Sequence, residues 1–285
     1  MSKQLLAFDI GGTTIKYALV DEQLNLSHTG KVATEQNKDG HILNELLDIA
    51  AEFQGNYQID AIGVSTAGIV GADGGILYAG PTIPGYQGTP IQEKLAEETN
   101  LPVFVVNDVD AALLGETVDG VAKNVGAAYC VALGTGIGGA YLLDGKLDSG
   151  AHSYANSIGY ILYDQESKTY FEQRASTLAL EDSLKSDGIS VIDAFEKAKQ
   201  NDEHYLAVIK NWSYEVARGL AEVVLLFDPE ILVIGGAVSQ QGEFLLDILR
   251  KQMSQLIPKG LFQTELKIAK LTDKAQLYGA ISKFV

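Results

Sequence analysis

The sequence has 285 residues, 46% of them hydrophobic, and its 37 acidic residues outnumber 21 lysines and arginines to give a formal charge of −16. This length and composition suit two medium domains or one large one around a sizeable core. The charge argues against nucleic acid and anionic membranes as partners, because no basic stretch is dense enough to neutralise phosphates.

The one cysteine, Cys130, lies in an apolar run and is expected to be a buried thiol. A single cysteine excludes a disulfide framework and a cysteine-based zinc site, and the four histidines are scattered without ligand spacing. The sequence enters a strand after Lys3, with no signal-peptide pattern and no apolar run of transmembrane length. We therefore expect a cytoplasmic protein.

In the first half, apolar strands end in glycines or small polar residues and alternate with helices. The helix near residue 90 has Thr89 as its expected cap and Pro90 in its first turn. Strands are predicted over residues 4–12, 14–22, 24–34, 60–70 and 101–108, and helices over 41–53, 89–100 and 109–118.

The second half begins with a G-x-G-x-x-G pattern at Gly134, Gly136 and Gly139, the spacing of a dinucleotide fingerprint. That fingerprint needs a helix after the glycines, whereas here a strand runs on to an Asp144-Gly145 hairpin turn. A strand–loop–strand of this kind can still hold a phosphate through its backbone N–H groups. Helices are then predicted over 175–185, 191–199, 203–227, 243–257 and 274–284, with strands over 230–236 and 265–271.

The two halves share a pattern. The stretches FDIGGTTIKYALVDEQL and ALGTGIGGAYLLDGKL both have a strand, a Gly/Thr loop, a strand, an acidic turn and a leucine. A duplication is the simplest explanation. Two related α/β halves would then aim two loops at one cleft, a geometry suited to a nucleoside triphosphate.

Four motifs, DIGGTTIKYALVD, VNDVDAALLGE, LGTGIGGAYLLDGKL and LVIGGAVS, occur in an order that resembles the ROK family of sugar kinases and repressors. The resemblance runs from Phe8 to about Ala280. It implies an α/β fold of two ribonuclease-H-like (actin-like ATPase) domains with a central cleft. We place these domains at 1–115 and 116–285, with the last helix a candidate to pack back on the first domain. Because the first motif begins at Asp9, there is no room before it for the repressors' helix-turn-helix, and the kinase branch is expected.

By this resemblance, Asp9 is a carboxylate near Mg²⁺, acting through water, which agrees with the preference of Mg²⁺ for oxygen ligands and retained waters. The alternative is a turn aspartate that caps a hairpin. The resemblance also implies that ATP phosphates face the first loop, although Lys16 could equally be a solvated strand residue. The residues of this loop are Gly11, Gly12, Thr13, Thr14 and Lys16.

The resemblance makes Asp108 the general base that accepts the proton of a sugar hydroxyl, while Asn107 holds an adjacent hydroxyl. Locally, Asp108 could simply be the N-cap of the following helix, and Asp110 reads as a first-turn acid. Gly68 would let a sugar hydroxyl approach the backbone. The segment 81–88 would reach over the sugar, without the asparagine that the family often has there.

In the second half, the resemblance assigns a phosphate loop and a glycine pair that meets adenosine. The alternative for each is a structural glycine bend. The loop consists of Gly134, Thr135, Gly136 and Gly138, and the pair is Gly235 and Gly236.

One segment departs from the family. Family glucokinases have Ala-Gly-Glu-x-Gly-His, whose histidine joins three cysteines around zinc, whereas ANSIGYI here places Ser157 at the glutamate and Tyr160 at the histidine. We therefore predict no structural zinc. Ser157, Tyr160 and Glu172 are candidate sugar contacts, with a core tyrosine as the alternative for Tyr160. A short neutral serine leaves a larger, less anionic pocket, which favours a glycoside or disaccharide.

The sequence thus predicts a carbohydrate kinase that uses Mg²⁺ and ATP to phosphorylate the 6-hydroxyl of a hexose or a glycoside. The alternatives are a catalytically weak sugar-binding sensor of the same fold and an actin-like or chaperone-type ATPase. The Asn107-Asp108 pair argues against the last of these. The partner is a small sugar, and the resemblance implies a homodimer.

Overall fold

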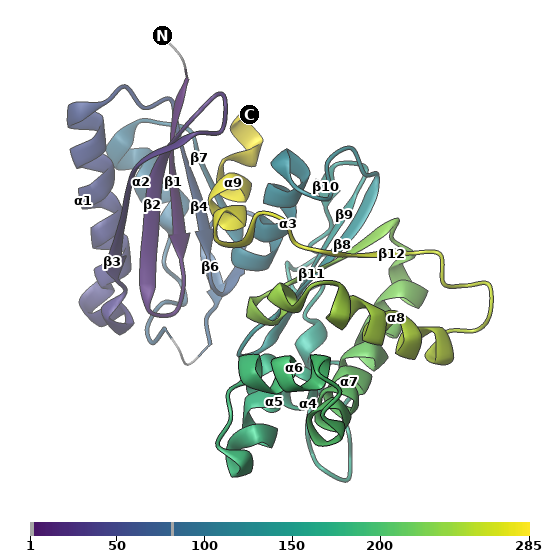
Figure 1. Ribbon diagram of the computed structural model, residues 1–285. Helices are drawn as coiled ribbons and strands as arrows, with labels where there is room; N and C mark the ends of the chain where they lie inside the picture. The colour runs from purple at the N-terminus through teal and green to yellow at the C-terminus, as the bar shows by residue number, and fades with distance from the viewer. Residues whose placement is uncertain (1–2, 81–82) are drawn as a thin grey trace. The chain divides into compact units, whose positions relative to one another are not determined.

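A computed structural model describes residues 3–80 and 83–285, and the chain forms two compact units (Figure 1). Unit 1 consists of Met1–Gly120, Ser149–Ala155 and Asp273–Val285, and unit 2 of Val121–Asp148 and Asn156–Thr272. Pro81 and Thr82, which open the segment expected over the sugar, lie outside the described residues.

The sheet of unit 1 has the strand order β3-β2-β1-β4-β7. Strands β1, β2 and β3 are antiparallel neighbours, and β4 and β7 run parallel to β1. Helices α1 and α2 lie on one side of this sheet and α3 on the other (Figure 1). The bounds are β1 Gln4–Ile10, β2 Thr14–Asp21, β3 Leu26–Ala33, β4 Ala61–Thr66, β7 Val103–Asn107, α1 His41–Asn56, α2 Ile91–Thr99 and α3 Asp108–Asp119, with β5 Ile69–Val70 and β6 Ile76–Tyr78 forming a separate hairpin.

The helix α9 (Ala275–Ile281), near the C-terminus, packs in unit 1 against α3, β1 and β4. Two glycines allow this close approach. A side chain on Gly115 of α3 would collide with the carbonyl oxygen of Ala275, and one on Gly279 of α9 with that of Ala111. The sheet face that carries α3 is therefore also covered by the last helix of the chain.

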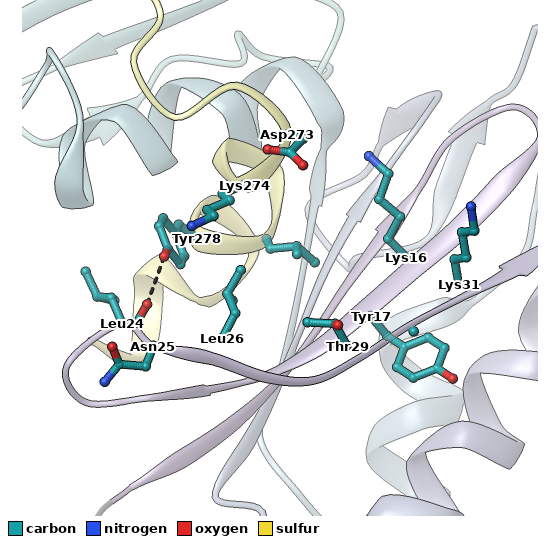
Figure 2. A pocket seen from close by; sticks show the side chains of 12 residues that line it. Lys16, Tyr17, Leu24, Asn25, Leu26, Thr29, Lys31, Asp273, Lys274 and Tyr278 are labelled. Carbon is teal, nitrogen blue, oxygen red and sulfur yellow. Dashed lines mark hydrogen bonds between the residues drawn. The ribbon is translucent and has the colours of Figure 1, made fainter.

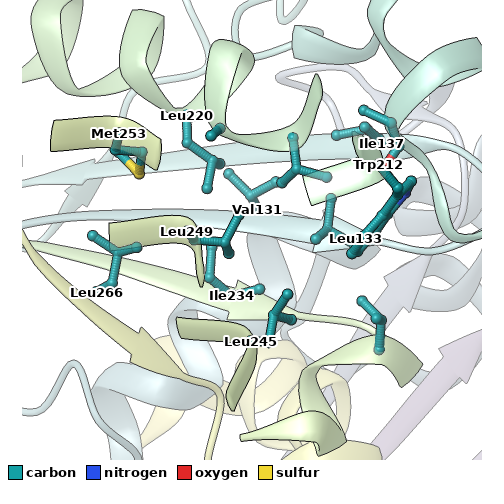
Figure 3. Close-up of a cluster of buried hydrophobic side chains, with 14 of the residues drawn as sticks. Val131, Leu133, Ile137, Trp212, Leu220, Ile234, Leu245, Leu249, Met253 and Leu266 are labelled. Atoms are coloured by element: carbon teal, nitrogen blue, oxygen red, sulfur yellow. The ribbon is translucent and has the colours of Figure 1, made fainter. Parts of the chain in front are cut away.

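The sheet of unit 2 has the order β10-β9-β8-β11-β12. Helices α7 and α8 pack on the sheet, where Val131, Leu133 and Ile234 share a buried hydrophobic cluster with Leu220 and Leu249 (Figure 3). The bounds are β8 Ala127–Leu133, β9 Ile137–Leu143, β10 Lys146–Leu147, β11 Ile231–Gly235, β12 Glu265–Ile268, α4 Phe171–Ala175, α5 Thr177–Leu184, α6 Val191–Lys199, α7 Glu203–Phe227 and α8 Glu243–Leu256.

Both sheets combine antiparallel strands with two parallel strands in the same order, so the repeated strand–loop–strand fold predicted from the sequence is confirmed. The predicted helices over 191–199 and 203–227 have the predicted ends, and Cys130 is buried.

Two helix starts differ from the prediction. Thr89 does not cap α2, because its hydroxyl donates to the carbonyl of Tyr86 at 2.6 Å and Pro90 takes the cap position. The helix expected from Ala175 begins at Thr177, because the Ser176 hydroxyl caps it by accepting from the N–H of Ala179.

Candidate functional site

Asp9, Lys16 and Ser65 form a row across the sheet of unit 1. Asp9 on β1 pairs in register with Lys16 on β2 and with Ser65 on β4, and residues paired in register point to the same face. The Ser65 hydroxyl donates to Oδ1 of Asp9 at 3.2 Å, and Nζ of Lys16 lies 3.6 Å from Oδ2. Asp9 is thus held from both sides within the sheet.

Asp9 is only 8% exposed. Burial raises its pKa above the ordinary aspartate value, while the nearby charge of Lys16 and the hydrogen bond from Ser65 act in the opposite direction. A carboxylate kept in this environment is poorly placed for a turn-capping role, because its two oxygens are engaged by side chains and not by the N–H groups of the turn.

The first predicted phosphate loop is the hairpin turn between β1 and β2. The N–H of Gly11 donates to the carbonyl of Thr14 at 2.9 Å and closes the turn. Thr34, the residue after β3, anchors the loop: its N–H donates to the carbonyl of Thr13 and its hydroxyl to that of Gly12. These bonds occupy carbonyl groups of the loop and leave its outer edge, with the exposed Thr13, toward solvent.

At the end of β7, Asn107 organises the residues around Asp108. Its side-chain carbonyl accepts from the N–H groups of Val109 and Asp110, so Asn107 is the cap of α3 and the cap reading for Asp108 is wrong. Its amide donates to the carbonyl of Gly68 at 2.7 Å and to Oδ1 of Asp108 at 2.9 Å. The structure therefore brings Gly68, Asn107 and Asp108 together.

Burial, and then the negative charge of Asp9, raise the pKa of Asp108 to about 6. Burial, and then Asp108, raise the pKa of Asp110 to about 7. Two carboxyl groups with raised pKa values at one strand end are the kind of arrangement found where a protein needs a base near neutral pH.

A groove of about 780 Å³ lies along β2, β3 and α9, lined by Lys16, Lys31, Lys274 and Tyr278 (Figure 2). Lys16 and Lys31 pair in register and extend in the same direction from the sheet. Of the predicted site residues, Lys16 alone lines this groove, so the groove borders the Asp9 row without including Asp108.

In unit 2, the second predicted phosphate loop joins β8 to β9. The N–H of Gly134 donates to the carbonyl of Gly136 at 3.0 Å. Thr177, at the start of α5, anchors the loop by donating from its N–H to Gly134 and from its hydroxyl to Leu133. Thr135 is exposed at the tip.

Glu172 lies against this loop. Its Oε2 accepts from the N–H of Ile137 at 3.2 Å, and a side chain added to Gly136 or Gly159 would come within 3 Å of the same oxygen. The sequence predicts that Glu172 contacts the sugar. In the structure, Glu172 also supports the loop through its hydrogen bond to the N–H of Ile137.

The pair Gly235 and Gly236 follows β11, and Gly235 pairs in register with Ala132 of β8. Gly236 has a φ of 90°, and a side chain there would collide with the backbone of Leu133, so this position requires glycine. At Gly235 the nearest heavy atom to an added Cβ is 3.8 Å away, which leaves room.

Ser157 is exposed and precedes the 3-10 turn over Ile158–Tyr160. Tyr160 is 56% exposed, so its alternative reading as a core tyrosine is wrong. Its ring lies edge-on to that of Tyr170, with centroids 5.7 Å apart.

Sequence reasoning missed Ser65, Thr34 and Thr177, which position Asp9 and the two loops. A signal existed for Ser65, since it and Thr66 are polar residues closing a wholly buried strand. None existed for Thr34 or Thr177, because each acts on a loop distant in sequence.

In residues 3–80 and 83–285, no three histidine, cysteine or acidic side chains gather as a ligand set for a metal ion. No helix in the described part of the chain is both long and apolar enough to cross a membrane.

Comparison with known proteins matches the ROK family to residues 5–284. A glucokinase of Streptomyces coelicolor is 30% identical over 305 residues, covering 96% of this chain and 95% of that protein. A beta-glucoside kinase of Listeria monocytogenes is 27% identical over 293 residues, covering 99% and 97%. The crystal structure of a ROK family glucokinase from Streptomyces griseus in complex with glucose and AMPPNP has a TM-score of 0.80 at 30% identity, covering 97% of both chains.

The duplicated sheets and these similarities define a carbohydrate kinase of the actin-like ATPase fold. The chain belongs to the ROK family, as its four motifs indicate.

Proposed function

We propose that this protein transfers the γ-phosphoryl group of ATP to the 6-hydroxyl of a hexose or a glycoside, with Asp108 as the general base. The observation that carries the proposal is the setting of Asp108 at the end of β7. It is a carboxyl group that Asn107 orients, and burial and then the charge of Asp9 raise its pKa to about 6.

In this reaction, Asp108 accepts the proton of the sugar 6-hydroxyl as the oxygen attacks the γ-phosphorus. The new bond joins that oxygen to phosphorus, and the bond from phosphorus to the β–γ bridging oxygen breaks, releasing ADP. Since phosphoryl transfer leaves a protein mainly positioning and charge stabilisation, one oriented carboxylate is sufficient base. Asn107 fixes that orientation, because its amide donates to Oδ1 of Asp108 and leaves Oδ2 for the sugar.

The acidic residues present fit a Mg²⁺ ion that arrives with ATP. Asp9 and Asp108 are close enough for the charge of Asp9 to raise the pKa of Asp108, and a divalent cation would relieve that repulsion. Mg²⁺ is commonly held by one or two carboxylates together with substrate phosphates and water, so a larger protein ligand set is not required. When bound, it would neutralise charge on the transferring phosphates.

We assign the phosphates of ATP to the two Gly/Thr loops, with Gly235 and Gly236 at the adenosine. Both loops are closed by internal hydrogen bonds and anchored by a threonine, so their N–H groups would be ordered before the nucleotide binds. Such preorganisation lowers the entropy cost of holding an anion.

The substrate class that we favour is a glycoside. The relatives include a beta-glucoside kinase as well as glucokinases. Ser157 is short, neutral and exposed where family glucokinases have a glutamate, which suits an anomeric carbon that carries a substituent. A homodimer remains an expectation from the family resemblance, and a cytoplasmic location remains an expectation from the sequence pattern.

The test is ADP release with Mg·ATP and a panel of glucose, N-acetylmannosamine, cellobiose and sucrose. We expect turnover with at least one sugar, and Asp108→Asn to lower kcat by about 100- to 10,000-fold while sugar binding persists in calorimetry. Asn can accept the same bonds from Val109 and Asn107, so folding is preserved. Asp48→Asn, an exposed change of equal charge on α1, is the control. Near-normal turnover in Asp108→Asn would remove Asp108 from the role of base, and no ADP release with any sugar would favour the sensor.

A further inference from the structure

The turn after β4 holds Gly68, the position where the sequence predicts that a sugar hydroxyl approaches the backbone. Gly68 has a φ of 98°, and a side chain there would lie 2.6 Å from the carbonyl oxygen of Tyr78 on β6, so the turn requires glycine. The side-chain amide of Asn107 donates to the carbonyl of Gly68 at 2.7 Å. In the described part of the chain, no group accepts a hydrogen bond from the N–H of Gly68, so this donor is available to a ligand.

A short series of hydrogen bonds holds the peptide group that carries this N–H. The N–H of Gly68 and the carbonyl of Ala67 belong to one planar peptide group, so a bond that fixes the carbonyl also fixes the direction of the N–H. The hydroxyl of Thr66 donates to the carbonyl of Ala67 at 3.1 Å. The N–H of Ala67 donates to the carbonyl of Ile10 on β1 at 2.9 Å, so the turn is tied to the sheet as well.

Tyr86 supplies the first bond of this series. Its hydroxyl oxygen lies 2.7 Å from Oγ1 of Thr66, and both residues are fully buried. A threonine hydroxyl has one proton, and Thr66 gives it to the carbonyl of Ala67, so Tyr86 is the donor to Thr66. Burial raises the pKa of the Tyr86 hydroxyl above its ordinary value, which keeps its proton in place at neutral pH. We call the series Tyr86, Thr66 and Ala67 the hydroxyl relay.

The backbone of Tyr86 is itself anchored. Its carbonyl accepts from the hydroxyl of Thr89 at 2.6 Å and from the N–H of Thr89 at 3.2 Å. The N–H of Gly88 donates to the carbonyl of Ile76 on β6 at 2.7 Å, and the ring of Tyr86 packs in the hydrophobic cluster of unit 1. A phenylalanine would fill the same space without the cost of burying a hydroxyl. What the hydroxyl adds at this position is therefore the bond to Thr66.

We propose that Tyr86 is a positioning residue for the sugar: acting through Thr66, it aims the N–H of Gly68 at a hydroxyl of the substrate. This inference rests on the proposed function and adds to it a residue buried behind the sugar site. The three residues and Asp108 all belong to unit 1. A hydrogen bond weakens steeply as its angle departs from linear, and a donor fixed in advance loses little entropy on binding, so an oriented N–H holds a hydroxyl more tightly than a mobile one.

The place of the turn in the sheet links this donor to the proposed base. Thr66 pairs in register with Asn107 at the ends of β4 and β7. The amide of Asn107 donates both to the carbonyl of Gly68 and to Oδ1 of Asp108. Because the N–H of Gly68 lies at the same strand ends as the base, its ligand is expected to be the sugar that this base deprotonates.

The experiment compares Tyr86→Phe with the wild type in steady-state kinetics with glucose and cellobiose, and in thermal unfolding as a check of the fold. We expect KM for the sugar to rise about three- to ten-fold, while kcat and KM for ATP change less than about twofold. Thr66→Val should raise KM for the sugar by a similar factor, whereas Thr66→Ser keeps the hydroxyl and should keep most of the affinity. Tyr57→Phe is the matched control, since it removes a tyrosine hydroxyl of unit 1 that bonds to His28 outside the relay.

A double substitution tests the hydroxyl relay as a unit. Tyr86→Phe together with Thr66→Val should raise KM for the sugar no more than the larger of the two single changes, because both act through the same bonds. Effects of the two changes that multiply would overturn the relay. Equal rises of KM for the sugar and for ATP in Tyr86→Phe would also overturn it, because the hydroxyl would then be acting on the fold.

Calorimetry with glucose and cellobiose in the absence of ATP separates this inference from the proposed function. A wild type that phosphorylates either sugar, with Tyr86→Phe binding that sugar equally well, overturns the role of Tyr86 and leaves the kinase intact. A wild type that binds a sugar but releases no ADP contradicts the kinase, and weaker binding of that sugar by Tyr86→Phe would still support the positioning role.

Discussion

The two units share a sheet order but differ in what their sheets carry at one equivalent position. In unit 1, one pair before the end of the hairpin, Asp9 faces Lys16 and its parallel neighbour is Ser65. The same position in unit 2 has Ala132 facing Gly138, with Gly235 as the parallel neighbour. Three polar or charged side chains in one unit thus correspond to three of the smallest residues in the other.

The difference shows how the same sheet topology can support two functions, one that uses charged side chains and one that uses exposed backbone groups. Unit 1 keeps charged side chains at the strand ends, where burial and then the charge of Asp9 raise the pKa of Asp108. Unit 2 removes side chains at the same register, so backbone can be approached closely by a ligand. The loops are anchored alike, by Thr34 in one unit and Thr177 in the other. The carboxylates beside them differ: Asp9 pairs with the side chain of Lys16, whereas Glu172 accepts from the backbone N–H of Ile137.

The largest effect is expected from removing the charge at Asp9 of unit 1 or adding a charge at Ala132, the equivalent position of unit 2. Asp9→Asn should lower kcat/KM by about 100-fold or more, since the carboxylate proposed to hold Mg²⁺ loses its charge. Ala132→Asp should raise KM for ATP about tenfold by opposing the phosphates, while Ala132→Ser changes it about twofold or less. Steady-state kinetics of the three variants measure kcat/KM and the KM for ATP. If substitutions at Asp9 and Ala132 had equally small effects, the two positions would not differ in function as proposed.

The adjacent glycines of unit 2 should respond oppositely to alanine. Gly236→Ala is expected to destabilise the protein by about 3 kcal/mol, because the new Cβ meets the backbone of Leu133 and the backbone has a positive φ. Gly235→Ala fits the fold, so any rise in its KM for ATP reports contact with the nucleotide. Urea unfolding and ATP kinetics separate the two, and a stable Gly236→Ala would contradict the packing described for this turn.

Asp110 shows how much a buried, ionised carboxyl group in unit 1 lowers the free energy of unfolding. Its pKa is raised to about 7, so the folded state binds more protons than the unfolded state and stability falls as pH rises from about 4 to 7. Asp110→Asn should therefore be more stable than the wild type by about 2 kcal/mol at pH 8, with the difference vanishing near pH 4. Thermal unfolding against pH, with Asp48→Asn as control, measures this; a gap that is constant with pH would point to packing.

The smallest effect concerns the pH profile. Because Asp108 must be ionised to act as a base and its pKa is about 6, kcat/KM should fall about tenfold between its plateau and pH 5. Stopped assays from pH 4.5 to 8 measure the limb. A fall in kcat/KM centred near pH 4 would show that burial and the charge of Asp9 do not raise the pKa of Asp108 in the substrate-free enzyme.

The elements that could be predicted are those whose cause is local. Apolar spacing predicted α6 and α7 to the residue, and the repeated Gly/Thr loops predicted the duplicated sheets. The cap predicted at Thr89 and the alternative cap weighed at Asp108 are both wrong, because neighbouring residues compete for one cap position. Asn107 takes the cap of α3 since its side-chain carbonyl reaches two N–H groups while its amide holds Asp108 and Gly68.

Motif order and hydrophobic pattern were enough to predict the family and the strand–loop–strand units, and to single out Asp108 as a candidate base, since these depend on residues close together in the chain. Folding alone decided which groups act on them: Ser65 and Lys16 on Asp9, and Thr177 and Glu172 on a loop tens of residues away. Hydrogen bonds and pKa shifts depend on distance in space and on burial, and neither can be derived from the spacing of residues in the sequence.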